Sequence, residues 1–264
     1  MSGYVYVGGG DTGPMAGAEV GRRVAMDSGG PPWLVVVHTL DRVHVTRWPG
    51  RLFRVAAVAP ADADVRESLR RANEGFAPSA GHSRAHAVDV LAELSPGVLF
   101  GPAGEEVARV ADAAAALTPA AVGRLAPACT DAGRAAYAAA WDRWLVDQPN
   151  PGPYLGSDHA ATLLIPGAGR VGSPIGHGFL AVHAAVRASA LTRGGAAAFT
   201  ADRRDEDGED EDTEERGTRL APAWSAAADA LLGAAMVLGA PDLLEPAEAA
   251  LLTAPWRLLT GGAR

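Results

Sequence analysis

The sequence predicts an α+β protein rich in helices. Two observations carry this prediction: strand-like patterns are confined to the first 60 residues, and helical periodicity dominates after them. We expect a small N-terminal antiparallel β element, at about residues 33–59, packed by roughly six to eight helices. A chain of 264 residues is long enough to form one domain over 1–264, because chains of this size bury roughly 70–75% of their unfolded surface.

The β signal lies in three neighbouring segments. Residues 33–38 (WLVVVH) and 51–59 (RLFRVAAVA) are apolar runs of strand length, and residues 42–48 (RVHVTRW) alternate between apolar and polar side chains. Pro49-Gly50 suits the central positions of a type II turn. The pattern therefore predicts an antiparallel pair over residues 42–58 that turns at this dipeptide.

Strict alternation in the second of these strands raises a conflict at two adjacent apolar residues. Leu52 and Phe53 cannot both face the core with Val43 and Val45. We expect one of the two to point away, or a β-bulge near Arg51.

Helical periodicity begins after residue 60. Apolar side chains recur at i, i+3 or i+4 and i+7 in four later stretches, and Pro246 suits a first helical turn while Pro255 is expected to end or kink the last helix. The four stripes are Val107–Val110–Ala111–Ala114, Tyr137–Trp141–Trp144–Leu145, Phe179–Val182–Val186–Ala190 and Trp224–Ala228–Leu231–Leu232–Ala235–Met236. The expected organisation is a Gly-rich segment (1–30), a β element (31–60), a helical body (61–200) with a long loop at 148–178, an acidic disordered insert (202–217) and C-terminal helices (220–264).

The acidic insert carries most of the chain's net charge of −8. Ten of the 31 acidic residues fall between Asp202 and Glu215, with only three arginines alongside, so the rest of the chain is close to neutral. A block of like charge repels itself and lacks the apolar area needed to order. We expect a solvated loop between two helical segments, with an electrostatic docking arm as the alternative.

Composition excludes several classes of function. All 23 basic residues are arginine, which with the abundant alanine and glycine is typical of a high-GC bacterial gene. A near-neutral body with an acidic insert lacks the broad basic surface that binds a nucleic-acid backbone, so we expect no nucleic-acid partner. Cys129 is the only cysteine, so Cys-rich zinc sites and intrachain disulfides are excluded.

A membrane or export role is not expected either. The N-terminus has no basic and apolar regions of a signal peptide. The most apolar stretch, Ala221–Ala240, is rich in alanine and interrupted by Asp229, whereas a membrane span needs ~18–20 strongly apolar residues. We therefore expect a soluble, cytoplasmic protein.

The N-terminal segment contains Gly8-x-Gly10-x-x-Gly13 directly after the strand-like YVYV. This motif resembles the dinucleotide-binding fingerprint, whose glycines let the backbone approach a pyrophosphate. His38 and Thr39 stand where a ribose-binding carboxylate belongs, and no series of βα units follows. A turn-forming glycine segment is the preferred interpretation, and nucleotide binding is the alternative.

Two groups of histidines offer candidate chemistry. His82 and His86 are four residues apart, so on a helix they would share one face and could share a metal, although a structural role for His86 is favoured. The loop at 148–178 holds Asp158 and His159, followed by Arg170, Ser173 and His177. An Asp–His pair can orient an imidazole as a general base. Asp158, His159 and His177 are therefore the candidate catalytic residues.

Two functions remain open from the sequence. The first is a small-molecule-binding or catalytic pocket around the 148–178 loop, with no identifiable cofactor. The second is an adaptor or regulatory protein that binds a protein partner through its helical surface. The pattern does not decide between an enzyme and a binding protein.

Overall fold

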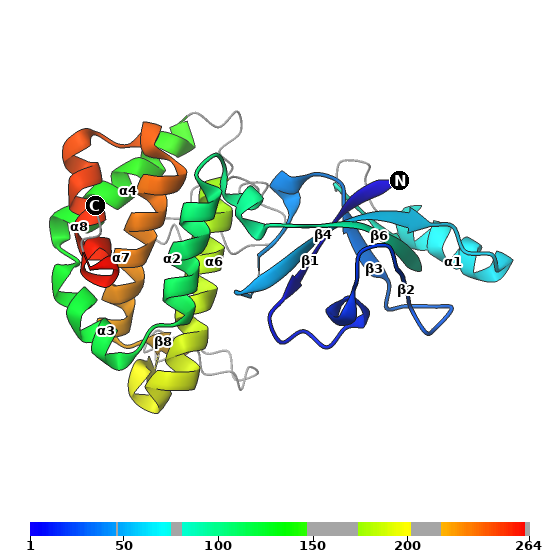
Figure 1. The fold of residues 1–264 in the computed structure, drawn as a ribbon, viewed down its shortest axis with the longest axis horizontal. Coiled ribbons are helices and arrows are strands. Elements are labelled where there is room, and N and C mark those ends of the chain that lie inside the picture. Colours follow the sequence, from blue (N-terminus) through cyan, green and yellow to red (C-terminus); the bar gives the residue numbers. More distant parts are fainter. Residues whose placement is uncertain (46, 75–80, 147–173, 202–217, 262–264) are drawn as a thin grey trace, which may run out of the picture. The chain divides into compact units, whose positions relative to one another are not determined.

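A computed structural model describes residues 1–45, 47–74, 81–146, 174–201 and 218–261. The chain forms two compact units. The sheet unit contains the described residues up to Glu105 together with 174–177, and the helical unit contains those from Glu106 to Val146 and from Gly178 onward. The prediction of an α+β, helix-rich protein is confirmed, although the sheet is larger than expected (Figure 1).

The sheet unit is built on a six-stranded sheet in the order β2-β6-β4-β1-β3-β5, in which every pair of neighbours is antiparallel. Its strands are β1 (Ser2–Gly8), β2 (Arg23–Ala25), β3 (Leu34–Val37), β4 (Gly50–Val58), β5 (His82–Ala85) and β6 (Ala87–Leu94). The unit also contains helix α1 (Ala63–Glu74) and the 3₁₀ turns η1 (Pro14–Gly17), η2 (Leu40–Arg42) and η4 (Pro96–Phe100).

The predicted hairpin over residues 42–58 is wrong. Residues 40–42 form η2, the described residues between it and β4 form no strand, and β4 pairs instead with β1 and β6. The alternation that suggested a strand has another origin, because Val43 and Val45 are both buried. They pack as part of a connection rather than of a ladder.

Strand β4 lies inside the sheet, which resolves the conflict at Leu52 and Phe53. Both side chains are buried, and their adjacency places them on opposite faces. The expected irregularity is present, but between Arg54 and Val55 rather than near Arg51. One strand with two covered faces therefore accommodates both residues.

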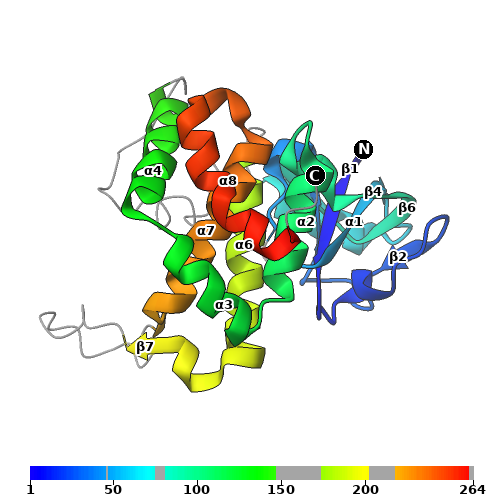
Figure 2. The same ribbon diagram turned by 60° about the vertical axis from the view of Figure 1, so that its left-hand side comes forward.

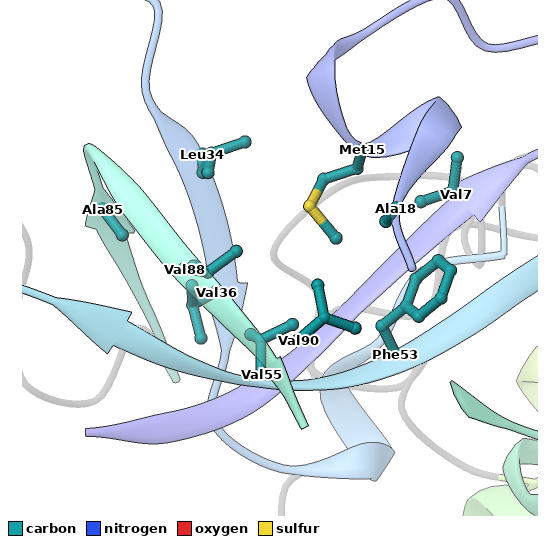
Figure 3. Packing of buried hydrophobic residues seen from close by; sticks show 10 residues of the cluster. All are labelled: Val7, Met15, Ala18, Leu34, Val36, Phe53, Val55, Ala85, Val88 and Val90. Atoms are coloured by element: carbon teal, nitrogen blue, oxygen red, sulfur yellow. The ribbon is translucent and has the colours of Figure 1, made fainter. Parts of the chain in front are cut away.

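A single apolar cluster covers one face of the sheet. Val36, Phe53, Val55 and Val90 project from three strands, β3, β4 and β6, and Met15 reaches the same cluster from η1 (Figure 3). The residues of this cluster are Val7, Met15, Ala18, Leu34, Val36, Phe53, Val55, Ala85, Val88 and Val90. The Gly-rich segment is thus fixed to the sheet by its own apolar residues.

The outer strand β5 is closed by a side chain of α1. The Asn73 amide oxygen accepts a hydrogen bond from the Arg84 N–H (2.8 Å), and its amide nitrogen donates one to the Arg84 carbonyl (3.1 Å). Asn73 thus makes the two bonds that a further strand would make at this position, and this blocks pairing with another chain.

The helical unit is a bundle whose central helix is α7 (Pro222–Gly239). This helix packs against α3, α4 and α8, and ten of its residues are buried (Figure 2). The other helices are α2 (Gly104–Ala115), α3 (Pro119–Leu125), α4 (Asp131–Val146), α6 (Pro174–Ser189) and α8 (Pro246–Thr260), with short turns at Ala126–Ala128, Gly195–Ala198 and Pro241–Leu243.

The predicted helical stripes are confirmed where their side chains are described. Val107, Val110 and Ala111 of α2 are buried, as are Trp141 of α4 and Leu231 of α7. Pro246 begins α8 behind a capping box formed by Glu245 and Glu248. Pro255 does not end α8, which continues to Thr260.

The apolar length of α7 also fits a membrane span by size and composition alone. More than half of that window is buried inside the protein, which is the pattern of a core helix in a soluble protein.

The acidic insert joins two strands rather than two helices. Strand β7 (Phe199–Ala201) precedes it and β8 (Thr218–Leu220) follows it, and the two pair antiparallel with Phe199 opposite Leu220. The two ends of the insert are therefore held side by side. The residues at 202–217 themselves lie outside the described part of the chain.

Candidate functional site

The catalytic residues predicted from the sequence are not tested by the structure. Asp158 and His159 lie outside the described residues, as do Arg170 and Ser173. His177 belongs to the first turn of α6, but its side chain is outside the described part. Whether these groups converge on one pocket stays a prediction.

The histidine pair proposed from the spacing of His82 and His86 does not form, because the helix that it required is absent. His82 opens β5, and His86 lies between β5 and β6 with its ring against Trp33 at 6.4 Å between centroids. Among the described residues, no group of three or more His, Cys, Asp or Glu side chains is placed to hold a metal ion.

A hollow beside the Gly-rich segment is a candidate site among the described residues. Its volume is about 370 Å³, which lies within the range of small-molecule sites. We call it the Gly-loop hollow. It is lined by Val5, Tyr6, Val7, Gly10, Asp11, Thr12, Gly13, Pro14, Met15, Ala16 and Arg47.

The glycines that open the loop allow two chain segments to approach closely. The Gly9 N–H donates to the Pro49 carbonyl at 2.7 Å, and a Cβ at Gly9 would lie only 2.5 Å from that oxygen. A Cβ at Gly8 would lie 2.8 Å from Cβ of Arg47. The sequence GGG thus brings the 47–49 segment against the end of β1.

Gly10 and Gly13 serve a different purpose in the same loop. Gly10 has a φ of +82°, in the left-handed region that glycine adopts most easily. A Cβ built at either residue would meet no atom within 4 Å. The backbone at these two positions is therefore open to a ligand.

Arg47 enters the hollow from a firmly held backbone. Tyr6 donates its hydroxyl hydrogen bond to the Arg47 carbonyl at 2.7 Å, and the next residue, Trp48, is buried with its ring 5.5 Å from that of Phe100. The Arg47 side chain as a whole remains 62% exposed. A fixed backbone with an accessible cation is the arrangement expected of a binding group rather than of a core contact.

The loop also presents unused hydrogen-bond donors. The backbone N–H groups of Gly10, Thr12 and Gly13 donate to no other described residue, although their neighbours Gly9 and Asp11 do donate. All three residues are exposed, so their N–H groups are accessible to a ligand. Three such donors beside one arginine form a set suited to an anion.

Acid–base chemistry is not supported by the described lining of the hollow. Burial raises the pKa of Tyr6, and the nearby Asp11 carboxylate raises it further, so the phenol stays protonated at neutral pH. Asp11 already accepts the Gly8 N–H and contacts Arg47. The arrangement can bind and orient a ligand, and its chemistry is that of recognition.

The sequence motif located this segment but predicted the wrong context for it. The dinucleotide fingerprint needs a parallel βαβ unit, whereas β1 lies between antiparallel neighbours and η1 spans only four residues. Arg47 was missed, because its approach depends on the pairing of β1 with β4. The run of three glycines, read as a site of close backbone approach, was the available signal.

No known family model, curated protein or solved structure matches this chain.

Proposed function

We propose that this protein binds a small molecule through an anionic group in the Gly-loop hollow. The observation that carries the proposal is the combination of an accessible, backbone-anchored Arg47 with three unused amides around one hollow. Val7 and Met15 line the same hollow and belong to the core cluster, so they offer an apolar surface to the rest of the ligand. An apolar wall with a few convergent polar groups is the usual composition of such sites.

The adaptor hypothesis has one observation in its favour. Helix α8 exposes Leu251 and Leu258, which lie seven residues apart on one helical face. Single exposed leucines are common on protein surfaces. The hollow is the more specific feature, because Arg47 and three residues whose amides are unused line the same space. The catalytic hypothesis at Asp158, His159 and His177 remains a separate proposal that the hollow neither requires nor replaces.

Replacing Arg47 tests the proposal directly. Arg47→Ala should weaken binding of an anionic probe, such as inorganic phosphate or adenosine monophosphate, by about tenfold or more, since charge-assisted hydrogen bonds contribute ~1.5–3 kcal/mol. Binding to the full chain can be measured by isothermal titration calorimetry at low ionic strength, where the charge contribution is largest.

Arg22→Ala is the matched control. Arg22 is also an exposed arginine paired with a carboxylate, Glu19 at 3.0 Å, but it does not line the hollow. It should leave binding unchanged. Equal losses in the two variants would point to a general charge effect, and an unaffected Arg47→Ala variant would refute the proposal.

A further inference from the structure

The Gly-loop hollow already holds one anion of the protein's own. Asp11 accepts the Gly8 N–H with Oδ2 at 2.9 Å, and its Oδ1 lies 3.4 Å from Nη1 of Arg47. A carboxylate therefore occupies the position beside the arginine that the ligand's anionic group would use. The inference below rests on the proposed function of this hollow.

We propose that Asp11 is a built-in competitor for the anion position beside Arg47, and that the ligand's anionic group is a phosphate monoester rather than a carboxylate.

The contact between Asp11 and Arg47 is weak enough to be displaced. It consists of one long N···O approach instead of the two short bonds of a forked pair. Both side chains are largely accessible to water, at 42% for Asp11 and 62% for Arg47. Exposed pairs of this kind contribute only ~0–1 kcal/mol. Asp11 can therefore lose Arg47 while it keeps its bond to Gly8.

Competition from the Asp11 carboxylate favours ligands that carry more negative charge than a carboxylate. A carboxylate ligand carries the same charge as Asp11 and offers the same two oxygens, so it gains little by exchange with a group that is already tethered there. A phosphate monoester carries about −1.5 to −2 charges at pH 7 and three acceptor oxygens. It can bind Arg47 more strongly and also use the amides of Gly10, Thr12 and Gly13, which Asp11 leaves unused.

Removing the charge of Asp11 separates this inference from the proposed function. In Asp11→Asn the amide oxygen can still accept the Gly8 N–H, but the competing charge is gone. Inorganic phosphate and glycerol phosphate should bind the full-length variant about three- to tenfold more tightly, because a competing ion pair and a like-charge repulsion are both removed. Acetate should stay a weak ligand of wild type and variant alike.

Glu19→Gln is the matched control, because it removes one exposed carboxylate, paired with Arg22, that does not line the hollow. It should leave the phosphate affinity unchanged. Asp11→Ser keeps a side-chain acceptor near Gly8 without the charge, and it replaces Asp11→Asn if the melting temperature shows that the latter is not folded.

Each outcome has a distinct meaning. Phosphate binding that depends on Arg47 but is not tightened by either Asp11 variant overturns the competitor and leaves the proposed function standing. Acetate binding as tightly as phosphate overturns the phosphate assignment. Failure of every probe, with no effect of Arg47→Ala, refutes the proposed function itself.

Discussion

The two units satisfy their polar groups in opposite ways. In the helical unit, the buried Ser189 hydroxyl lies 2.8 Å from the carbonyls of both Ala114 and Ala115, and Arg193 donates to the Ala115 carbonyl at 2.6 Å. In the sheet unit, the unused amides of Gly10, Thr12 and Gly13 and an exposed arginine line one hollow without bonding to one another. In these examples, the helical unit pairs its polar groups with one another, whereas the sheet unit leaves hydrogen-bond donors available to a ligand.

This contrast shows what the polar groups of each unit are used for. The Ser189 and Arg193 side chains complete the C-terminus of α2, whose last carbonyls have no partner within the helix. The Gly-rich loop does the reverse, since it leaves backbone N–H donors at the surface without a hydrogen-bond partner in the described part of the protein. Stability is the evident role of the first arrangement and ligand recognition the proposed role of the second.

The largest expected effect tests whether the units are also independent in folding. Phe53→Ala removes a fully buried ring from the sheet core and should destabilise the sheet unit by about 3–5 kcal/mol. Hydrogen exchange followed by mass spectrometry should show lost protection in β1, β4 and β6, with the protection of α7 unchanged.

Leu231→Ala supplies the reciprocal measurement, because Leu231 is fully buried in α7. It should lower the protection of the helical unit by about 2–5 kcal/mol and leave the sheet protected. If either variant lowers protection in both units equally, the chain unfolds as the single domain over 1–264 that the sequence suggested.

The same contrast explains how much could be predicted from the sequence. Helices are set by local periodicity, so the stripes that contain Val107, Trp141, Phe179 and Leu231 identified the helical unit correctly. The acidic insert was recognised as a segment, but the short strands on either side of it were not, because three residues carry too little pattern.

Strand pairing is set by contacts distant in sequence, and here the prediction lost accuracy. Residues 82–94 fall within the helical body expected at 61–200, yet they form β5 and β6 because neighbouring strands supply their hydrogen bonds. Strand β1 was taken for part of a Gly-rich segment, although it pairs with β4 over seven residues. The hollow depends on that pairing, so Arg47 could not be found from sequence.

A smaller effect tests the closed hydrogen bonds of the helical unit. Ser189 is 1% exposed and also accepts a hydrogen bond from Arg193 at 3.0 Å. Ser189→Ala should cost about 1–3 kcal/mol in the free energy of unfolding, because the Ala114 and Ala115 carbonyls lose the hydroxyl donor that they share and the Arg193 guanidinium loses an acceptor. Denaturant unfolding measures this loss. Ser225→Ala, at an exposed serine of α7, should change stability little, and an equal loss there would contradict the account.

The smallest expected effect concerns a carboxylate of the helical unit that has no hydrogen bond to another described residue. Asp229 is the only charged residue of α7. Burial raises its pKa, and the opposite charge of Arg134 lowers it by less. No hydrogen bond joins the Asp229 side chain to another described residue. Asp229 is therefore like the unused amides of the Gly-rich loop, which have no hydrogen-bond partner among the described residues, and unlike Ser189, which has several.

A raised pKa in the folded state fixes the sign of the pH dependence. The folded protein binds the Asp229 proton more tightly than the unfolded chain, so this residue's contribution to stability is fully present below the unfolded pKa and is lost as the pH rises through the folded pKa. Asp229→Asn removes that loss. The variant should melt a few degrees higher than the wild type at pH 7, and the difference should shrink as the pH falls toward 4.

Asp242→Asn is the control for the general effect of removing one negative charge, because Asp242 is an exposed aspartate of the same unit. Melting temperatures of the wild type and both variants across this pH range give the comparison. If Asp229→Asn is less stable than the wild type at pH 7, the carboxylate has a partner that stabilises its charged form. Asp229 would then be satisfied within the helical unit, as Ser189 is. A higher melting temperature that is found only near neutral pH, and only in Asp229→Asn, would show that the charged Asp229 carboxylate lowers the stability of the helical unit.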